Sequence, residues 1–363
     1  MWMVITAMTI KRIAPVLAAA LLAALPLVAQ QQPAVNEKID VNLVLLDAVV
    51  TDRTGQQILG LDKDNFVVKE DGVPQQIDSV AYYTNRTLVT STEENAAFKN
   101  EHIRSDRYFV VFLDKPQNGF LYDELIHARQ ALEKFVDQQM QPGDRMAIVG
   151  HDVRLKVYSD FSSDKKQLRK ALNDAIRFSR GLTGKSGLAT DSIMHNIDSS
   201  AMIDHTGNVY EGLQVLAEAL RPIKARKQLI LISPGILENG QSIFAGAPSE
   251  SRYYKPMIQE LNAADVTVSA INLDTQNPSL DPAVHDTLER VTADTNGTYY
   301  RNATNFATPL KNIEKDSSGY YLISYYTKKD PGRSGYQKVT VSLTNPEFRI
   351  KSREGYLFGP KEE

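Results

Sequence analysis

Continuous apolar runs alternate with segments of helical periodicity through the middle of the chain, and this pattern restricts the fold more than any other feature. Residues 108–113 form one such run, and residues 121–136 then carry apolar side chains at helical spacing. Similar runs occur at residues 229–232 and 266–271. Strands that are apolar throughout are typical of a parallel sheet covered on both faces. The pattern therefore predicts an α/β fold, with a doubly wound, mainly parallel sheet and right-handed crossovers.

A β pattern precedes this region. Residues 41–50 have the composition of a strand, and residues 70–72 have the chemistry of a tight turn. Phe66 precedes that turn, and Ile77 and Val80 follow it. We therefore predict a hairpin whose second arm carries Ile77 and Val80.

The β pattern returns near the carboxyl terminus, at residues 320–326 and 339–343. A few strands alone are only marginally stable. We therefore predict that the N-terminal β segment, residues 41–90, packs with the C-terminal β segment, residues 319–358, as a smaller β-sandwich. The α/β domain, residues 105–318, would then be inserted between the two segments.

The amino terminus has the features of a secretory signal peptide. Lys11 and Arg12 precede an apolar stretch at residues 13–25. We predict that residues 1–29 are a cleaved signal peptide, that residues 30–40 are a linker, and that the protein is exported to the periplasm or the exterior. The alternative is an uncleaved membrane anchor, but an apolar stretch of roughly 13 residues is shorter than the ~20 that span a bilayer.

Charge and composition exclude several classes of function. The formal net charge is −3, without a basic stripe, which argues against nucleic acid as a partner. The absence of cysteine excludes disulfides, thiolate metal sites and cysteine nucleophiles. The sequence has no phosphate-binding glycine loop, zinc-protease motif or nucleophile elbow in a suitable context, so we assign no catalytic residue.

Ligands of open α/β sheets bind beyond the carboxyl ends of the strands, where the strand order reverses. Several segments that follow predicted strands, together with the loop before the predicted helix at residue 209, should meet at that edge. The candidate binding rim consists of Asp114, Pro116, Asn118, Asn208, Pro234 and Asp274.

A set of short motifs in a fixed order resembles a known family. The motifs are Gly60-Leu61, Asn65-Phe66, Glu70-Asp71-Gly72, the strands at 109–114 and 321–325, Pro142-Gly143-Asp144-Arg145, Asp160-Phe161-Ser162-Ser163-Asp164, Arg226-Lys227-Gln228-Leu229 and Arg353-Glu354-Gly355-Tyr356. Together they resemble the von Willebrand factor A (VWA)-related domain family described from acidobacterial exported proteins. The likeness extends from Val41 to Tyr356.

The resemblance implies a VWA-like domain, and such domains often carry a Mg²⁺ site built from an Asp-x-Ser-x-Ser loop, a distant Thr and a distant Asp. Asp114 matches the first carboxylate, but Pro116 and Asn118 replace the two serines. Asn208 stands where Thr is expected, and Pro234 where Asp is expected. The metal site therefore looks degenerate, because Asp114, Asn118 and Asn208 would hold Mg²⁺ only weakly. Alternatively, Asp114 caps backbone amides and the two Asn residues form loops.

Other candidate sites have simpler interpretations. We interpret His151 beside Asp152 as a solvated surface pair. A transition-metal site in the long loop at residues 179–206 is a further hypothesis, although the spacing matches no known ligand pattern. Its ligands would be His195, Asp198, Asp204 and His205. Tyr253 and Tyr254 are either an exposed contact for a partner or partly buried aromatic residues at the start of a helix.

The sequence thus favours an exported, non-enzymatic binding or adhesion module without a cofactor. Its rim would recognise a protein or a surface polymer. One alternative is an Mg²⁺-dependent adhesion module that uses Asp114. Others are a hydrolase with its site in the 179–206 loop and a purely structural role in an envelope assembly.

Overall fold

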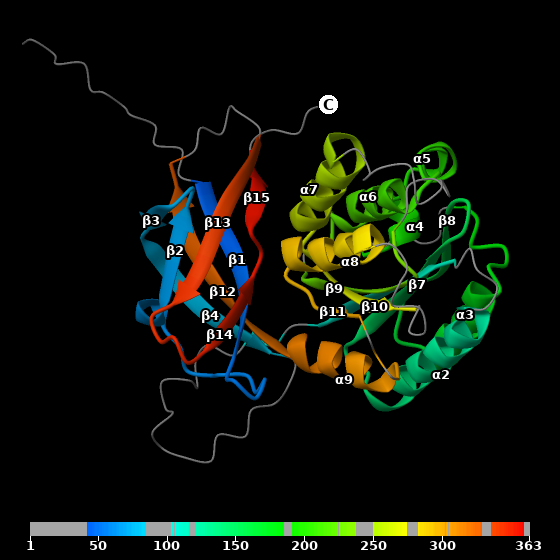
Figure 1. The fold of residues 1–363 in the computed structure, drawn as a ribbon, viewed down its shortest axis with the longest axis horizontal. Helices are drawn as coiled ribbons and strands as arrows, with labels where there is room; N and C mark the ends of the chain where they lie inside the picture. Colours follow the sequence, from blue (N-terminus) through cyan, green and yellow to red (C-terminus); the bar gives the residue numbers. More distant parts are fainter. Residues whose placement is uncertain are drawn as a thin grey trace, which may run out of the picture. The chain divides into compact units, whose positions relative to one another are not determined.

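The computed structural model describes residues 42–84, 103–104, 106–115, 121–184, 191–223, 225–236, 250–273, 282–301, 303, 305–328 and 335–358. All statements below concern these residues (Figure 1). Within them, no helix has both the length and the apolar character needed to cross a membrane.

The central sheet has six strands in the order β11-β10-β9-β6-β7-β8. The strands are β6 (Tyr108–Asp114), β7 (Arg145–His151), β8 (Leu155–Ser162), β9 (Lys227–Ser233), β10 (Val266–Asn272) and β11 (Tyr299–Tyr300). All neighbours pair in parallel except β7 and β8, which are antiparallel. This confirms the predicted mainly parallel, doubly wound sheet. The chain order reverses between β6 and β9, so the ligand-binding edge of such a fold lies where these two strands end.

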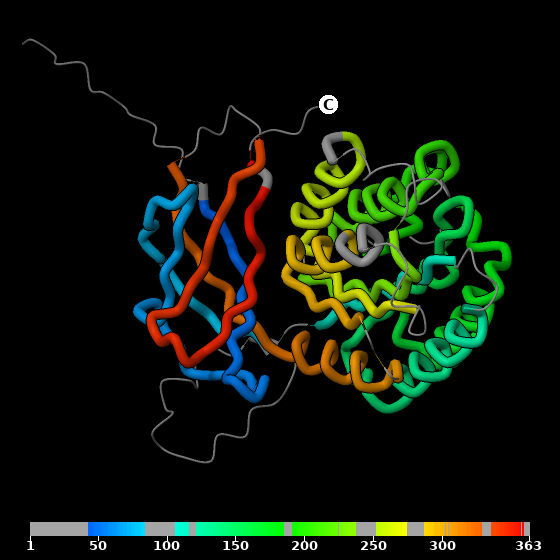
Figure 2. The backbone as a smooth tube through the Cα atoms, viewed as in Figure 1, coloured from blue at the N-terminus to red at the C-terminus, as the bar shows by residue number. Residues whose placement is uncertain are grey.

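Helices cover both faces of this sheet (Figures 1 and 2). One face packs against α4 (Ile193–Asn196), α6 (Val209–Leu220), α7 (Lys255–Ala263) and α8 (Pro282–Asp294). The other packs against α2 (Tyr122–Gln138), α3 (Lys165–Ile176) and α9 (Ala307–Asp316). Two further short elements are α5 (Ser199–Asp204) and a π-helical turn at Glu250–Tyr254. The long loop predicted at residues 179–206 thus contains two short helices, α4 and α5.

The flanking segments form two antiparallel-rich sheets with a common core. The five-stranded sheet has the order β14-β1-β12-β4-β5, and the four-stranded sheet has the order β15-β13-β2-β3. The strands are β1 (Asn42–Thr51), β2 (Phe66–Glu70), β3 (Val73–Gln75), β4 (Ile77–Thr84), β5 (Ile103–Arg104), β12 (Gly319–Thr327), β13 (Gly335–Leu343), β14 (Arg349–Ser352) and β15 (Gly355–Phe358). A 3-10 turn, Lys63–Asn65, precedes β2. Apolar residues from both sheets share one core, which confirms the predicted small sandwich.

The predicted hairpin is wrong in its second arm. The strand that pairs with β2 after the turn is the three-residue β3, whereas Ile77 and Val80 belong to β4 and pair with β12 in the other sheet. Pro74 lies in β3 and cannot donate a backbone hydrogen bond, so β3 is confined to the edge of its sheet. The chain then crosses to the second sheet, where the apolar residues of β4 pair with β12.

A buried ion cluster joins the sandwich to the α/β domain. Asp47 on β1 accepts a hydrogen bond from Arg353 Nε (2.7 Å) and lies 3.1 Å from Arg226 Nε. Arg353 also donates to Asp265 (2.6 Å) and to the backbone oxygen of Asn262 (2.8 Å). The cluster therefore links β1 and the segment between β14 and β15 to residues beside β9, α7 and β10.

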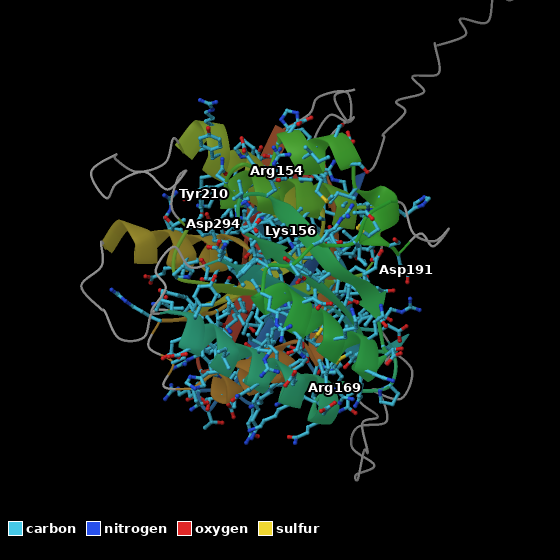
Figure 3. The ribbon with its side chains drawn as sticks, turned by 90° about the vertical axis from the view of Figure 1, so that its right-hand side faces the viewer. Arg154, Lys156, Arg169, Asp191, Tyr210 and Asp294 are labelled. Atoms are coloured by element: carbon cyan, nitrogen blue, oxygen red, sulfur yellow. The ribbon has the colours of Figure 1, made fainter. Side chains whose placement is uncertain are left out.

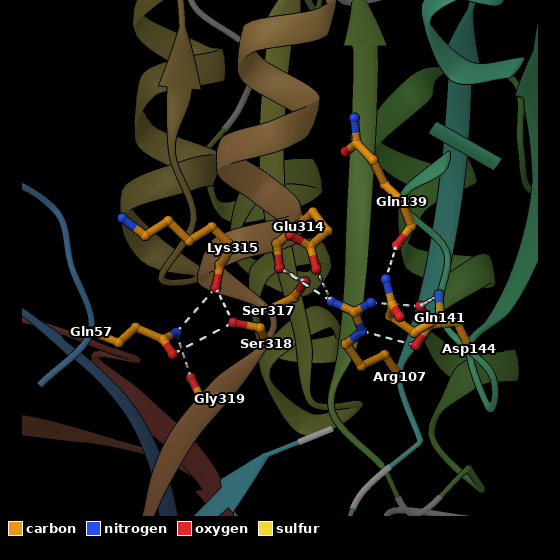
Figure 4. Close-up of polar contacts among 10 residues, drawn as sticks. All are labelled: Gln57, Arg107, Gln139, Gln141, Asp144, Glu314, Lys315, Ser317, Ser318 and Gly319. Atoms are coloured by element: carbon orange, nitrogen blue, oxygen red, sulfur yellow. Dashed lines mark hydrogen bonds and ion pairs between the residues drawn. The ribbon is translucent and has the colours of Figure 1, made fainter. Parts of the chain in front are cut away.

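A second polar cluster lies at the amino ends of β6 and β7 (Figure 4). Arg107 makes a two-pronged ion pair with Asp144 and also bonds Glu314 on α9. Asp144 accepts a further hydrogen bond from the backbone N–H of Gln141. Gly143 has a positive φ of 98°, and a Cβ there would lie 2.7 Å from an oxygen of Asp106. The Pro-Gly-Asp-Arg motif thus forms a turn that fixes one end of the sheet.

Candidate functional site

The ends of β6, β7 and β9 bring three polar side chains together at the reversal point. Ser233 Oγ donates a hydrogen bond of 2.7 Å to Asp114 Oδ2, and His151 Nδ1 lies 3.9 Å from Asp114 Oδ1. The backbone N–H of Gly235 donates to Ser233 Oγ at 3.0 Å. All three side chains are buried. We name Asp114, His151 and Ser233 the strand-end cluster.

Asp114 is electrostatically unusual. Burial raises its pKa to about 7, and the hydrogen bonds from Ser233 and from the backbone of Lys115 only partly offset this effect. No arginine or lysine forms an ion pair with Asp114 within the described part of the chain. The carboxyl group is therefore largely protonated at slightly acidic pH, so it carries little charge there.

The sequence led us to expect a solvated surface residue at His151, but the structure shows that His151 is buried. Its exposure is only 4%, because its ring stacks on Phe112 and faces Gly212 of α6. Nε2 lies 3.0 Å from the carbonyl oxygen of Thr206, so this nitrogen carries the proton. Burial lowers the pKa of His151, and the ring is neutral at neutral pH. The missed signal was Gly212: a Cβ there would lie 3.2 Å from the imidazole, and a glycine inside a helix indicates such a close approach.

The segment before α6 is fixed to this cluster by polar contacts. The Thr206 hydroxyl accepts a hydrogen bond from the backbone N–H of Leu155 (3.0 Å) and donates to the carbonyl of Met202 (2.7 Å). Asn208 is the N-cap of α6, and its Oδ1 accepts from the backbone N–H of Glu211 at 2.9 Å. These contacts hold α5, α6 and β8 in fixed positions around the rim.

The structure locates only part of the predicted rim. Asp114 and Asn208 are buried, and Pro234 is partly exposed beside Ser233. Pro116, Asn118 and Asp274 lie outside the described residues. Ser233 and His151, which the prediction did not include, are the closest polar neighbours of Asp114.

The donors in this region suit a divalent cation poorly. One oxygen of Asp114 accepts from Ser233, and the side-chain oxygen of Asn208 caps α6. Among the described residues, no group of three or more His, Asp or Glu side chains is placed to hold a metal ion. Mg²⁺ prefers several oxygen ligands in octahedral geometry. Since one oxygen of Asp114 and the side-chain oxygen of Asn208 are already hydrogen-bonded within the protein, we derive no chemistry through a metal.

The four residues proposed for a metal site in the 179–206 segment, His195, Asp198, Asp204 and His205, do not form a group that could hold a metal ion either. Asp198 instead caps α5 by accepting from the backbone N–H of Ser200 at 2.8 Å. His195 lies in α4. The acidic side chain therefore stabilises a helix start, a common role for Asp in that position.

Tyr254 is a buried aromatic residue at the start of a helix, which is the second of the two interpretations given above, and not an exposed contact for a partner. It is buried, its hydroxyl donates to Asp294 at 2.5 Å, and the Arg290 guanidinium lies 4.3 Å from its ring centroid. Burial and the Asp294 carboxylate raise its pKa. Tyr253 is half-buried and packs on Tyr210, with ring centroids 6.4 Å apart. The pair thus joins the helices on one face of the sheet.

Comparisons with known proteins give limited information. No model of a protein family matches the chain, and no curated protein matches it. Among solved structures, it is similar to an aerotolerance-related membrane protein from Bacteroides fragilis, with 14% identity, coverage of 58% of this chain and 98% of the other, and a TM-score of 0.38.

Two further structures show a similar degree of likeness. The vWF domain of the type V pili tip protein Mfa5 from Porphyromonas gingivalis shares 14% identity, covers 58% of this chain and 94% of its own, and has a TM-score of 0.37. Manganese-loaded TRAP from Plasmodium vivax shares 9% identity, covers 76% of this chain and 96% of its own, and has a TM-score of 0.36. Likenesses this weak carry no argument about function, and the fold class rests on the strand order described above.

Proposed function

We propose that this protein is an exported, non-enzymatic module that binds another protein at the rim formed by the carboxyl ends of β6, β7 and β9, without a metal ion. The observation that carries the proposal is the state of Asp114. The carboxyl group at the reversal point is buried, has a pKa raised to about 7, and is hydrogen-bonded to Ser233. A group in that state supports the surrounding structure rather than offering a charge to a cation.

The surface above this cluster supports a binding role. Val153, in the turn between β7 and β8, is 73% exposed, and Ile203 on α5 is 50% exposed. Both belong to segments that Thr206 links by its hydrogen bonds to Leu155 and Met202. Exposed apolar side chains at the ligand-binding edge of an α/β sheet favour contact with a protein partner.

The arrangement of the strand-end cluster does not favour catalysis. A serine nucleophile requires a base that takes its proton. Here Ser233 is fully buried, so a substrate does not reach its hydroxyl, and His151 directs its protonated nitrogen at the carbonyl of Thr206 rather than at Ser233. The cluster therefore does not present an accessible, activated nucleophile.

Site-specific photo-crosslinking tests the proposal. A photoreactive phenylalanine analogue would replace Val153 in the full-length protein, produced in its own host. A matched variant would carry the same analogue at Lys166, an exposed position at the start of α3. The expected result is a protein adduct from position 153 that persists when a metal chelator is present.

Each other result overturns part of the proposal. Adducts from position 166 alone, or from neither position, would contradict protein binding at the rim. An adduct from position 153 that disappears with the chelator, and returns with Mg²⁺, would contradict metal-independent binding and restore the Mg²⁺-dependent alternative.

A further inference from the structure

Basic side chains gather at the part of the rim where β6, β7 and β8 meet the end of α3. Lys115 directly follows β6, Arg154 lies in the turn between β7 and β8, and Lys156 lies on β8. Arg177 and Arg180 flank Phe178 just after α3. We name these five residues the basic rim.

Direct contacts hold these segments together. The Lys115 ammonium lies 5.5 Å from the centroid of the Phe178 ring, and Lys156 Nζ donates to the Phe178 carbonyl at 3.1 Å. The backbone N–H of Leu182 donates to the carbonyl of Val157 at 2.7 Å, so the segment after α3 runs beside β8. Figure 3 shows Arg154 and Lys156 in one region of the molecule, well separated from Arg169 on α3.

Within the described segments, most of this positive charge is not neutralised by ion pairs. Lys156 pairs with Asp152 at 2.6 Å, whereas Lys115, Arg154, Arg177 and Arg180 make no ion pair with any described residue. The nearby Asp174 pairs with Lys170. Asp114, the residue before Lys115, has a pKa raised to about 7 and contributes at most part of a negative charge. The rim is therefore locally positive on a chain whose formal net charge is −3.

Apolar side chains lie among these charges. Val153 precedes Arg154, and Leu182, which is 41% exposed, follows Arg180 closely in the chain. A polyanion such as nucleic acid would use the cations but not the apolar groups, and the overall negative charge would oppose a long polyanion. A polypeptide segment with both acidic and apolar side chains matches both features.

We propose that the ligand of the rim is an acidic segment of a protein, whose carboxylates pair with Lys115 and Arg154 while its apolar side chains contact Val153 and Leu182. This inference rests on the proposed function and names the chemistry of its partner. It predicts binding that depends on salt and not on divalent metal.

The test uses fluorescently labelled peptides of Glu, Leu and Gly residues, with fluorescence anisotropy of the purified protein as the readout. The Lys115→Glu/Arg154→Glu variant reverses two charges of the basic rim. The Lys166→Glu/Lys311→Glu variant makes the same charge change on exposed residues elsewhere. Lys166 lies 11 residues before Arg177 on α3, or about 16 Å along the helix. A peptide with Gln in place of Glu, and the polysaccharide heparin, serve as further probes.

We expect the wild-type protein to bind the Glu peptide, and binding to weaken about tenfold in the rim variant but less than about twofold in the matched variant. Raising the salt concentration should weaken binding, and the Gln peptide should bind poorly. Urea unfolding checks that both variants fold.

Three results would overturn the inference: no binding of the Glu peptide by the wild-type protein, equal weakening in both variants, or tight binding of heparin alone. Any of these would leave the crosslinking result at Val153 intact, so failure of the ligand assignment is distinguishable from failure of the proposed function.

Discussion

Asp47 and Asp114 are both buried aspartates, and the protein accommodates them in opposite ways. Burial alone would raise the pKa of Asp47, but attraction to Arg353 and Arg226 outweighs it and lowers the pKa below its usual value. Asp114 has no such cation among the described residues, and burial raises its pKa to about 7. One carboxyl group stays charged because it is paired, and the other is stable when it is neutral.

This difference distinguishes a structural joint from the proposed binding rim. The Asp47 cluster joins the sandwich to the α/β domain by the buried ion pairs of Asp47 with Arg226 and Arg353. Near Asp114 the cations are instead at the surface, where a ligand can reach them. The contrast also implies opposite pH dependence. Stability from Asp47 is present above pH ~4 and is lost as pH falls, whereas stability from Asp114 is present at low pH and is lost as pH rises toward 7.

The largest expected effect is that of Asp47→Ala. The substitution leaves the buried Arg353 and Arg226 without their common counter-charge, which should lower the free energy of unfolding by about 3–5 kcal/mol. Urea unfolding measures the change. Glu347→Ala, which removes an exposed ion pair with Arg53, is the matched control and should cost less than ~1 kcal/mol. Equal effects of the two substitutions would contradict the role of the ion cluster.

The second effect is the pH dependence due to Asp114. Because its folded pKa exceeds its unfolded value of 3.8, ionisation should reduce the free energy of unfolding between pH ~4 and pH ~8 by as much as about 4 kcal/mol. Asp114→Asn resembles the neutral form and should remove this dependence. The variant should match the wild-type protein only below pH ~4, and should exceed its stability by about 1–2 kcal/mol at pH ~5 and by about 4 kcal/mol at pH ~8. Parallel pH profiles for the two proteins would show that Asp114 is ionised in the folded state.

A smaller effect is expected for Ser233→Ala. Loss of the hydroxyl removes one hydrogen bond to Asp114 and should destabilise the protein by about 1–2 kcal/mol. That hydrogen bond lowers the pKa of Asp114, so the substitution should raise this pKa further. Unfolding curves at several pH values measure both changes. Ser342, an exposed serine on β13, provides the control Ser342→Ala. An unchanged or lower pKa of Asp114 would contradict the assignment of the donor.

The sequence predicted the parts of the fold that rest on periodicity. Apolar runs such as residues 108–113 become central strands because only a sheet covered on both faces buries them fully. Helix α9 was missed although Phe306, Leu310 and Ile313 have helical spacing and are buried. The second arm of the hairpin was misplaced because periodicity does not report which sheet a strand joins.

The site was less predictable. Asp114 and Asn208 follow from their positions at the end of a strand and the start of a helix. The hydrogen bond between Asp114 and Ser233 joins residues 119 positions apart, and the burial of His151 depends on packing against α6. Local patterns carry no information about such long-range contacts, and they do not reveal that no lysine or arginine in the described part of the chain pairs with Asp114.

The most direct test of the account is the carboxyl-carbon NMR signal of Asp114, assigned with the Asp114→Asn variant and followed through a pH titration with and without about 10 mM Mg²⁺. We expect a midpoint near 7 that Mg²⁺ leaves unchanged. A midpoint below about 4, or a clear shift on addition of Mg²⁺, would show a charged carboxylate available to a cation and would contradict metal-independent binding at this rim.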